Sequence, residues 1–261
     1  MERTCSRSRA SSSGSVSARG YDSKMDAVLQ QWILNLATDF AVPLKLLPEV
    51  LDGDDGQAQA LNVKSLRGIS PIEGFELLTE LADKGLVRLK RGSDTLIPSN
   101  ARRLLKTPGG EREVSFELTE DGGREWERVA APDWRQMDEG SGIVAAEDDQ
   151  ATLRDWTWFS QDRDRLMAVL GWYPMVQDEQ IDVATIRWEI HSEYEVKYWK
   201  RLSNVHVVNF RSSSQREPIR RWVPRGVEPQ WFTAWRISRD NWYRKPWDME
   251  GWPPPRSPSS S

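Results

Sequence analysis

Apolar residues recur every three or four positions between Ser70 and Lys84, the spacing of one face of an α-helix. Ser70 can cap the free amide groups of the first turn, Pro71 suits the first helical position, and Glu73 stands where a capping box places its carboxylate. Gly85 is a residue that commonly ends a helix. The pattern therefore predicts a helix whose apolar face is formed by Ile72, Phe75, Leu78, Leu81 and Ala82.

Two short stretches after this helix alternate between apolar and polar residues, as strands do. They cover residues 86–91 and 114–118, and Thr119 follows as a cap for a helix that carries Trp126. Helical spacing also runs from Lys24 to Phe40 and, more briefly, over 44–51. Helices followed by two strands and a closing helix predict an N-terminal winged helix-turn-helix domain over residues 22–135.

The second half of the chain has weaker patterns. Residues 136–150 are acidic and glycine-rich, which predicts a linker. A helical stretch and three strand-like stretches predict a small, Trp-rich α+β unit over residues 151–210. A Trp/Arg-rich arm over residues 211–252 is expected to pack on that unit, and residues 1–21 and 253–261 are expected to be disordered tails. The predicted fold class is therefore α+β.

The composition predicts no catalytic, cofactor-binding or metal-binding residues. One cysteine (Cys5) and two histidines (His191 and His206) are too few for the usual zinc sites. The chain also lacks a phosphate-binding glycine loop and a nucleophile-elbow serine. No apolar run is long enough to cross a bilayer and no secretory signal is present, so we expect a cytoplasmic protein without membrane contact.

Charge is unevenly distributed along the chain. Residues 22–150 contain 15 Lys/Arg and 25 Asp/Glu, a net charge of −10, whereas residues 151–261 contain 17 and 14, a net charge of +3. Within the acidic half, one group of basic residues offers contacts to phosphates or to an acidic partner: Arg88, Lys90, Arg91, Arg102, Arg103 and Lys106. The alternative interpretation is a solvated face that balances nearby acids.

Tryptophans and arginines interleave in the C-terminal arm, and this pairing is enriched at binding hot spots. The candidate docking surface consists of Trp222, Trp231, Trp235, Trp242, Arg220 and Arg221. Burial of the same rings within the chain is the alternative interpretation.

The motif Phe116-Glu117-Leu118-Thr119-Glu120-Asp121-Gly122, after the helix end Ala82-Asp83-Lys84-Gly85-Leu86-Val87, resembles winged-helix regulators of the MarR and PadR type. The resemblance covers residues 24–130 and implies that the 70–84 helix would enter the major groove of DNA. That helix, however, carries four carboxylates and one lysine, which disfavours nucleic acid as the partner.

These patterns lead to three functional hypotheses. The first is a non-catalytic interaction or scaffold protein that binds a protein partner. The alternative is a DNA-binding transcriptional regulator that uses the basic wing, and the third is a cryptic enzyme in the C-terminal half. The sequence predicts neither an oligomeric state nor a specific partner.

Overall fold

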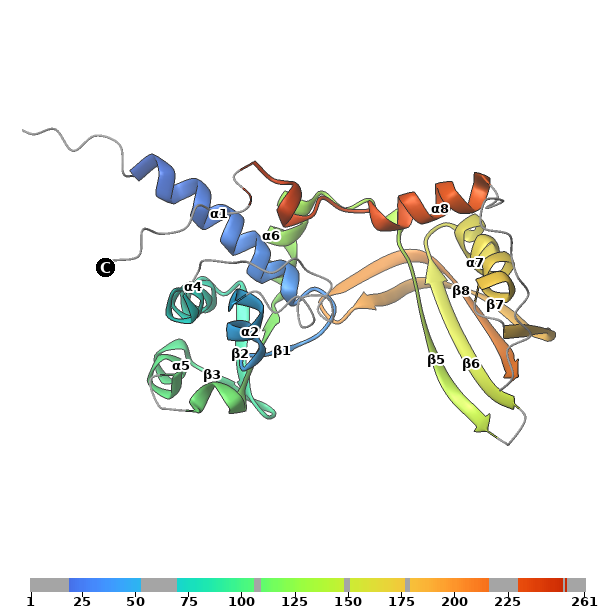
Figure 1. Ribbon diagram of the computed structural model, residues 1–261, viewed down its shortest axis with the longest axis horizontal. Helices are drawn as coiled ribbons and strands as arrows, with labels where there is room; N and C mark the ends of the chain where they lie inside the picture. Colours follow the sequence, from blue (N-terminus) through green and yellow to red (C-terminus); the bar gives the residue numbers. More distant parts are fainter. Residues whose placement is uncertain are drawn as a thin grey trace, which may run out of the picture.

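The structure, a computed structural model, describes residues 19–52, 70–105, 109–147, 151–176, 179–215, 230–250 and 252. These residues form two lobes, each built on a four-stranded antiparallel sheet (Figure 1). Lobe 1 is the part from α1 to η2, and lobe 2 is the part from β5 to α8. Residues 241–252 follow α8 and return to lobe 1.

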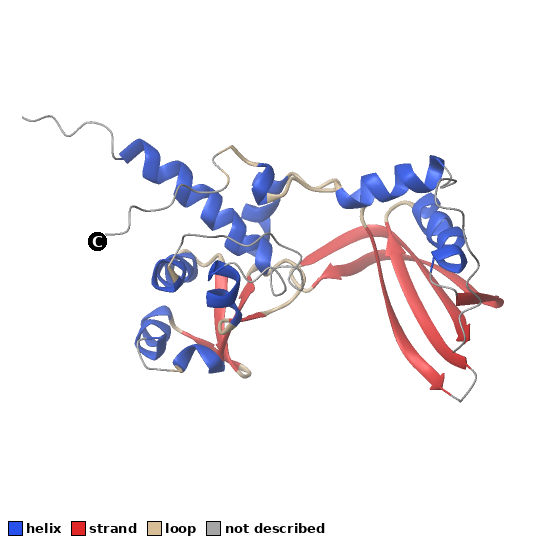
Figure 2. Ribbon diagram, in the orientation of Figure 1, coloured by secondary structure: helices blue, strands red, loops and turns tan. Residues whose placement is uncertain are grey.

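Lobe 1 contains helices around a small sheet with the strand order β1-β4-β2-β3 (Figure 2). Leu89 of β2 lies at the centre of this sheet, opposite Leu96 on one side and Phe116 on the other. The elements are α1 (Arg19–Leu36), β1 (Val42–Pro43), α2 (Leu46–Asp52), α4 (Pro71–Asp83), β2 (Val87–Arg91), β3 (Asp94–Leu96), α5 (Pro98–Leu105), η1 (Gly110–Glu113), β4 (Val114–Leu118), α6 (Glu120–Ala130) and η2 (Trp134–Gln136).

The predicted helix at 70–84 is confirmed as α4. Its capping box is complete, because the Ser70 hydroxyl accepts from the Glu73 amide and the Glu73 carboxylate accepts from the Ser70 amide. Leu78 and Leu81 are fully buried in the core of lobe 1, where they join Trp126 from α6. The predicted strands at 86–91 and 114–118 are likewise confirmed as β2 and β4.

Lobe 2 is a large sheet with the strand order β5-β6-β8-β7. Its elements are β5 (Asp138–Glu147), β6 (Ala151–Ser160), α7 (Arg163–Val176), β7 (Glu179–Lys197), β8 (Lys200–Gln215) and α8 (Gln230–Asp240), and the short η3 (Pro246–Asp248) follows on lobe 1. Both long helices cover one face of the sheet. Leu166 and Val169 of α7 and Trp235 of α8 pack on Val208 and Phe210 of β8.

The predicted fold class, which specified a winged helix-turn-helix domain followed by a small unit, is wrong. The structure has two four-stranded antiparallel sheets, where the sequence predicted a winged helix-turn-helix domain and a small Trp-rich α+β unit. In lobe 1, β1 and β3 add a strand at each edge of the sheet. They span only two and three residues, which is too short for an alternation of apolar and polar positions to be visible in the sequence.

The predicted linker is also wrong, because most of residues 136–150 form the ten-residue strand β5. Glycine is depleted in strands, and Gly140 and Gly142 therefore favoured a linker over a strand when the sequence alone was considered. The structure gives the reason for both residues. A Cβ atom on Gly140 would lie 2.2 Å from the Trp158 ring, and one on Gly142 would lie 2.6 Å from the Trp156 ring.

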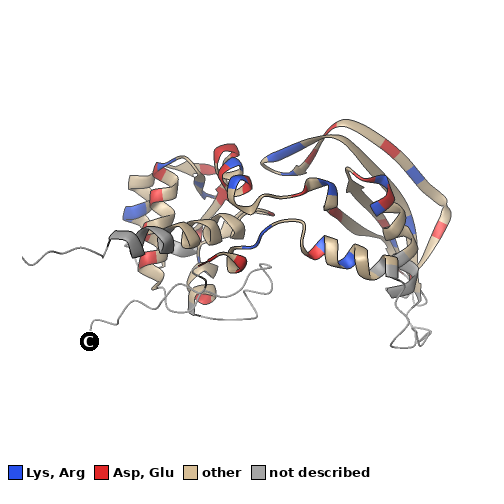
Figure 3. Ribbon diagram, turned by 90° about the horizontal axis from the view of Figure 1, so that it is seen from above, with Lys and Arg blue, Asp and Glu red and all other residues tan. Residues whose placement is uncertain are grey.

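The C-terminal arm is divided between the lobes. Residues 211–215 belong to β8, and α8 packs on lobe 2 as expected for the arm. The aromatic residues after α8 instead pack on the core of lobe 1: Trp242, Tyr243, Trp247 and Trp252. Of the predicted tails, residues 1–18 and 253–261 lie outside the described residues, whereas α1 begins at Arg19. Figure 3 shows acidic and basic residues interspersed along the ribbons of both lobes.

Candidate functional site

The turn between β7 and β8 joins the two lobes. The Tyr198 hydroxyl donates to the carbonyl of Ala37 and accepts from the amide of Leu118, both at 2.6 Å. The neighbouring Trp199 indole donates to the carbonyl of Thr38 at 2.9 Å. Burial raises the pKa of the Tyr198 phenol above its ordinary range, so the hydroxyl keeps its proton and both hydrogen bonds.

Five aromatic rings meet behind this turn, and we call them the aromatic junction: Trp126, Trp134, Trp199, Trp242 and Tyr243. Ring centroids lie 5.9 Å apart between Trp126 and Trp199, and 5.0 Å apart between Trp134 and Trp242. Such contacts contribute beyond the area that the rings bury. Because the rings come from both lobes and from the C-terminal segment, the junction fixes the lobes to each other.

An ion-pair cluster lies beside the junction. The ammonium group of Lys197 lies 2.7 Å from Asp39 of lobe 1 and 2.5 Å from Glu139 of β5. Burial opposes the charge of Lys197, but the two carboxylates outweigh it and raise the lysine pKa. A strand of lobe 2, a loop of lobe 1 and the start of β5 are thus held by one cation.

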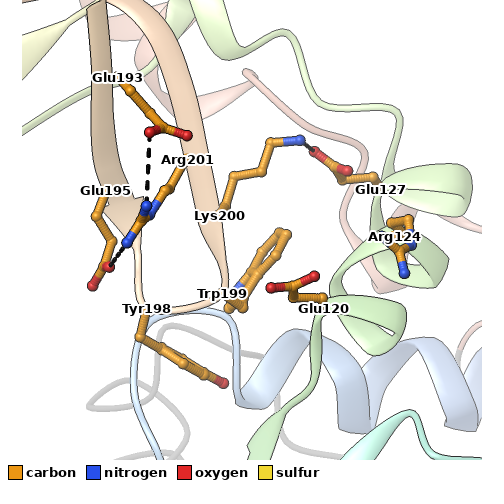
Figure 4. Close-up of a pocket in the computed structure, with 9 residues that line it drawn as sticks. All are labelled: Glu120, Arg124, Glu127, Glu193, Glu195, Tyr198, Trp199, Lys200 and Arg201. Carbon is orange, nitrogen blue, oxygen red and sulfur yellow. Dashed lines mark ion pairs between the residues drawn. The ribbon is translucent and has the colours of Figure 1, made fainter. Parts of the chain in front are cut away.

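A cleft of about 730 Å³ opens between α6 and the β7–β8 turn (Figure 4). Lys200 reaches across it to Glu127 at 2.6 Å, and Arg201 lies 3.7 Å from Glu193. The lining residues are Glu120, Arg124, Glu127, Glu193, Glu195, Tyr198, Trp199, Lys200 and Arg201. They present a polar surface of mixed charge and no nucleophile paired with a base.

Carboxylates engage most of the predicted basic group. Arg88 and Lys90 both contact Glu117 on the neighbouring strand, at 3.0 and 3.3 Å. Arg91 pairs with Glu113, and Arg102 pairs with Asp83. Arg103 lies exposed on α5, and Lys106 lies outside the described residues. The described cations thus lie on lobe 1, and the four paired ones contact carboxylates of the same lobe.

The predicted docking surface does not form one patch in the described part of the chain. Trp235 is 7% exposed in the core of lobe 2, and Trp242 belongs to the aromatic junction. Trp231 is 44% exposed near the start of α8. Trp222, Arg220 and Arg221 lie outside the described residues.

Strand β5, which sequence analysis missed, is an edge of the large sheet. It pairs with β6 on one side, and no described segment pairs with its other side. Ser141 to Glu147 are exposed, including the apolar side chains of Ile143 (69%) and Val144 (55%). The sequence signal for this edge is the matching alternation of Gly140 and Gly142 with Trp158 and Trp156, which the pairing of the two strands places ring over glycine.

The start of β5 is anchored by a buried network. The Asp138 carboxylate accepts from Arg165 of α7 at 2.6 and 2.9 Å, and from the Trp235 indole of α8 at 3.0 Å. The Asp138 side chain is fully buried, so losing Arg165 would leave its charge with only the more distant Arg239, at 3.5 Å. The edge strand is therefore held in place by both helices that cover the sheet.

Among the described residues, no three His, Cys, Asp or Glu side chains gather as metal ligands. In the same part of the chain, none of the helices combines the length and the apolar character that crossing a membrane requires.

We found no family model, no curated protein and no solved structure that matches this chain. The resemblance to MarR- and PadR-type regulators therefore stays a prediction.

Proposed function

We propose that this chain is a non-catalytic scaffold that binds a protein partner by accepting an extended strand along the free edge of β5. The observation that carries the proposal is the uncharged free edge from Gly140 to Ala146, which is exposed from Ser141 onward. A free edge offers a row of backbone amide and carbonyl groups, and proteins recognise extended peptides by adding them to such edges.

The opposite edge of the same sheet supports this choice by contrast. Strand β7 is protected in the usual ways, by charged side chains and by irregular register. Its pairing with β8 breaks between Asp182 and Arg187, and again between Glu195 and Lys197. Its exposed charged residues include Asp182, Arg187, Glu189, Glu193 and Glu195. Strand β5 has no such charges over seven consecutive residues and pairs regularly with β6 from Asp138 to Val144.

Rigidity is the second supporting property. An edge that is already in the strand conformation loses little conformational entropy when a peptide adds to it. The Asp138 network and the Lys197 cluster fix the start of β5 against α7, α8 and lobe 1. The edge is therefore organised before the partner arrives.

DNA binding through the basic group ranks second. Its cations include Arg88, Lys90, Arg91 and Arg102, which are engaged by carboxylates. Each would have to exchange a carboxylate for a phosphate, which lowers the gain from counterion release. In this alternative the DNA contacts the basic group, and the acidic helix α4 does not have to face the phosphates.

The test selects binders of the full-length chain from a displayed library of short random peptides. The affinity of each selected peptide for the chain is then measured. Ile143→Lys places a charge on the β5 edge, and Val183→Lys does the same at an equally exposed site on β7 (75%). We expect Ile143→Lys to weaken peptide binding at least tenfold and Val183→Lys to leave it unchanged. Equal affinity for the Ile143→Lys variant and the unaltered chain would contradict the proposal. Circular dichroism and melting curves check that both variants fold.

A further inference from the structure

We infer that the strand which adds to β5 belongs to a second copy of this chain, so that two large sheets join as one continuous eight-stranded sheet about a two-fold axis. The inference rests on the proposed function of the β5 edge and names its occupant. It is carried by the order of small and apolar residues along the regular part of β5 and by the indole ring that lies over Gly142.

The two faces of β5 are fixed by its pairing with β6. Gly140, Gly142 and Val144 lie opposite Trp158, Trp156 and Arg154, on the face that α7 and α8 cover. Ser141 and Ile143 lie opposite Thr157 and Asp155, on the other face. A two-fold axis through Gly142 keeps both faces in register, because each residue then meets a residue from the same face of the other copy.

In this register, Gly142 meets Gly142 of the copy, Ser141 meets Ile143, and Gly140 meets Val144. All five residues are uncharged, so the pairing buries no ion and opposes no like charges. A register centred on Ile143 would place Glu139 opposite Glu147 and would include the irregularity between Val144 and Ala146. A register centred on Ser141 would bring Glu139 opposite Ile143, with its charge inside the pairing.

The Trp156 indole gives the Gly142 pair a contact across the axis. It is half-buried, and it occupies the space that a side chain on Gly142 would fill. Neighbouring strands lie about 4.8 Å apart, so the two copies of β6 would be separated by about 14 Å across the paired β5 strands. The edge of each indole that lies over Gly142 faces the axis, while its N–H donates to Ser212 of β8 at 3.0 Å. In the paired sheet the two ring edges face each other above the glycine pair.

The side chains on the other face of the sheet, which α7 and α8 do not cover, are also compatible with this pairing. Asp155, which lies beside Ile143, is held by Arg211 at 2.7 Å, and this hydrogen bond lowers the pKa of the Asp155 carboxyl. Thr157, which lies beside Ser141, is held by Asn209 at 2.7 Å. These side chains are satisfied within the sheet, so the incoming strand needs no charged residue to meet them.

Five paired residues are few compared with the interfaces that hold permanent dimers. We therefore expect a reversible equilibrium between monomer and dimer that depends on protein concentration. Sedimentation equilibrium of the full-length chain over a hundredfold range of concentration measures it. We expect Ile143→Lys to weaken dimerisation at least tenfold, since each dimer then contains two new charges at the pairing. Val183→Lys, on the other edge, should leave dimerisation unchanged.

A second readout reports on the indole. In chains labelled with 5-fluorotryptophan, the Trp156 resonance, assigned with Trp156→Phe, should shift with concentration in the unaltered chain and stay fixed in the Ile143→Lys variant. A chain that is monomeric at every concentration, or a dimer that Ile143→Lys leaves intact, would overturn the inference. A monomer whose selected peptides are still lost on Ile143→Lys would refute the second copy while the proposed strand addition stands.

Discussion

At the scale of single residues, the molecule repeatedly places a tryptophan ring where a glycine has no side chain. Gly123 of α6 lies under Trp199, and a Cβ atom there would lie 2.0 Å from the ring. Gly142 lies under Trp156 in the same way, on the edge strand. The first contact lies between the lobes and the second lies at the β5 edge, and both glycines are required by packing and not by backbone conformation.

Gly123→Ala should therefore destabilise the chain, although alanine is the better helix former. We expect a loss of about 1–3 kcal/mol in the free energy of unfolding, the usual cost of overpacking a core. Gly171→Ala in α7 is the matched control, because its nearest neighbour would be Trp231 at 3.8 Å, an ordinary contact. The control should gain about 0.5–1 kcal/mol. Urea titrations measure both, and a stabilised Gly123→Ala variant would show that the Trp199 ring can move aside.

Tyr243 in the aromatic junction predicts a dependence on alkaline pH. Burial raises the pKa of its phenol to about 12, whereas the unfolded chain titrates near the ordinary value of about 10. Between these values only the unfolded state loses the proton, so the stability that is complete below pH 10 falls as pH rises. Tyr243→Phe should reduce this slope by on the order of 1 kcal/mol per pH unit. Identical slopes in denaturation between pH 10 and 12 would place Tyr243 in water.

At the scale of elements, a helix or strand could be predicted when the interactions that stabilise it come from its own residues. Helix α4 could be predicted because its cap, Ser70 to Glu73, and its apolar face are local features. Strand β5 could not, because its glycines are explained by rings on the next strand, Trp156 and Trp158. The basic group was found by composition, but Glu117, the partner of Arg88 and Lys90, lies 29 and 27 residues from them along the chain, and only the fold brings them together.

The ion pairs on β2 predict weak binding to DNA. With Arg88 and Lys90 engaged by Glu117, we expect a dissociation constant for duplex DNA no tighter than the non-specific range of roughly 10⁻⁴–10⁻⁶ M at physiological salt. Fluorescence anisotropy with the full-length chain measures it. Glu117→Gln, which frees both cations, should tighten binding. Tight binding by the unaltered chain that falls steeply with salt would favour the DNA-binding alternative.

At the scale of the whole molecule, the C-terminal segment ties the chain into one body. After α8 it returns to lobe 1, where the Asp133 amide donates to the carbonyl of Trp242 and the Arg244 amide donates to the carbonyl of Ala130, both at 2.7 Å. Trp242 and Tyr243 then complete the aromatic junction. Because these contacts fix the two lobes to each other, the β5 edge keeps one position relative to lobe 1.

Ending the chain after Asp240 should remove this closure. The truncation takes away Trp242 and Tyr243 and exposes Trp126, so we expect a loss of about 3–5 kcal/mol or more, the scale of emptying one buried aromatic site. Near- and far-ultraviolet circular dichroism should show one coincident transition in the full chain. Two separate transitions in the full chain, or an unchanged midpoint after truncation, would show that the lobes are independent.

The central claim is that the β5 edge accepts a strand, and amide hydrogen exchange tests it most directly. The full-length chain, kept dilute enough to be monomeric, is compared with and without a selected peptide. Alternate amides between Gly140 and Val144 should exchange more slowly with the peptide, because every second amide of an edge strand points outward. Amides of β7 from Val183 to Ile190 should not change. Protection confined to the cleft beside Trp199, with β5 unaffected, would contradict the account.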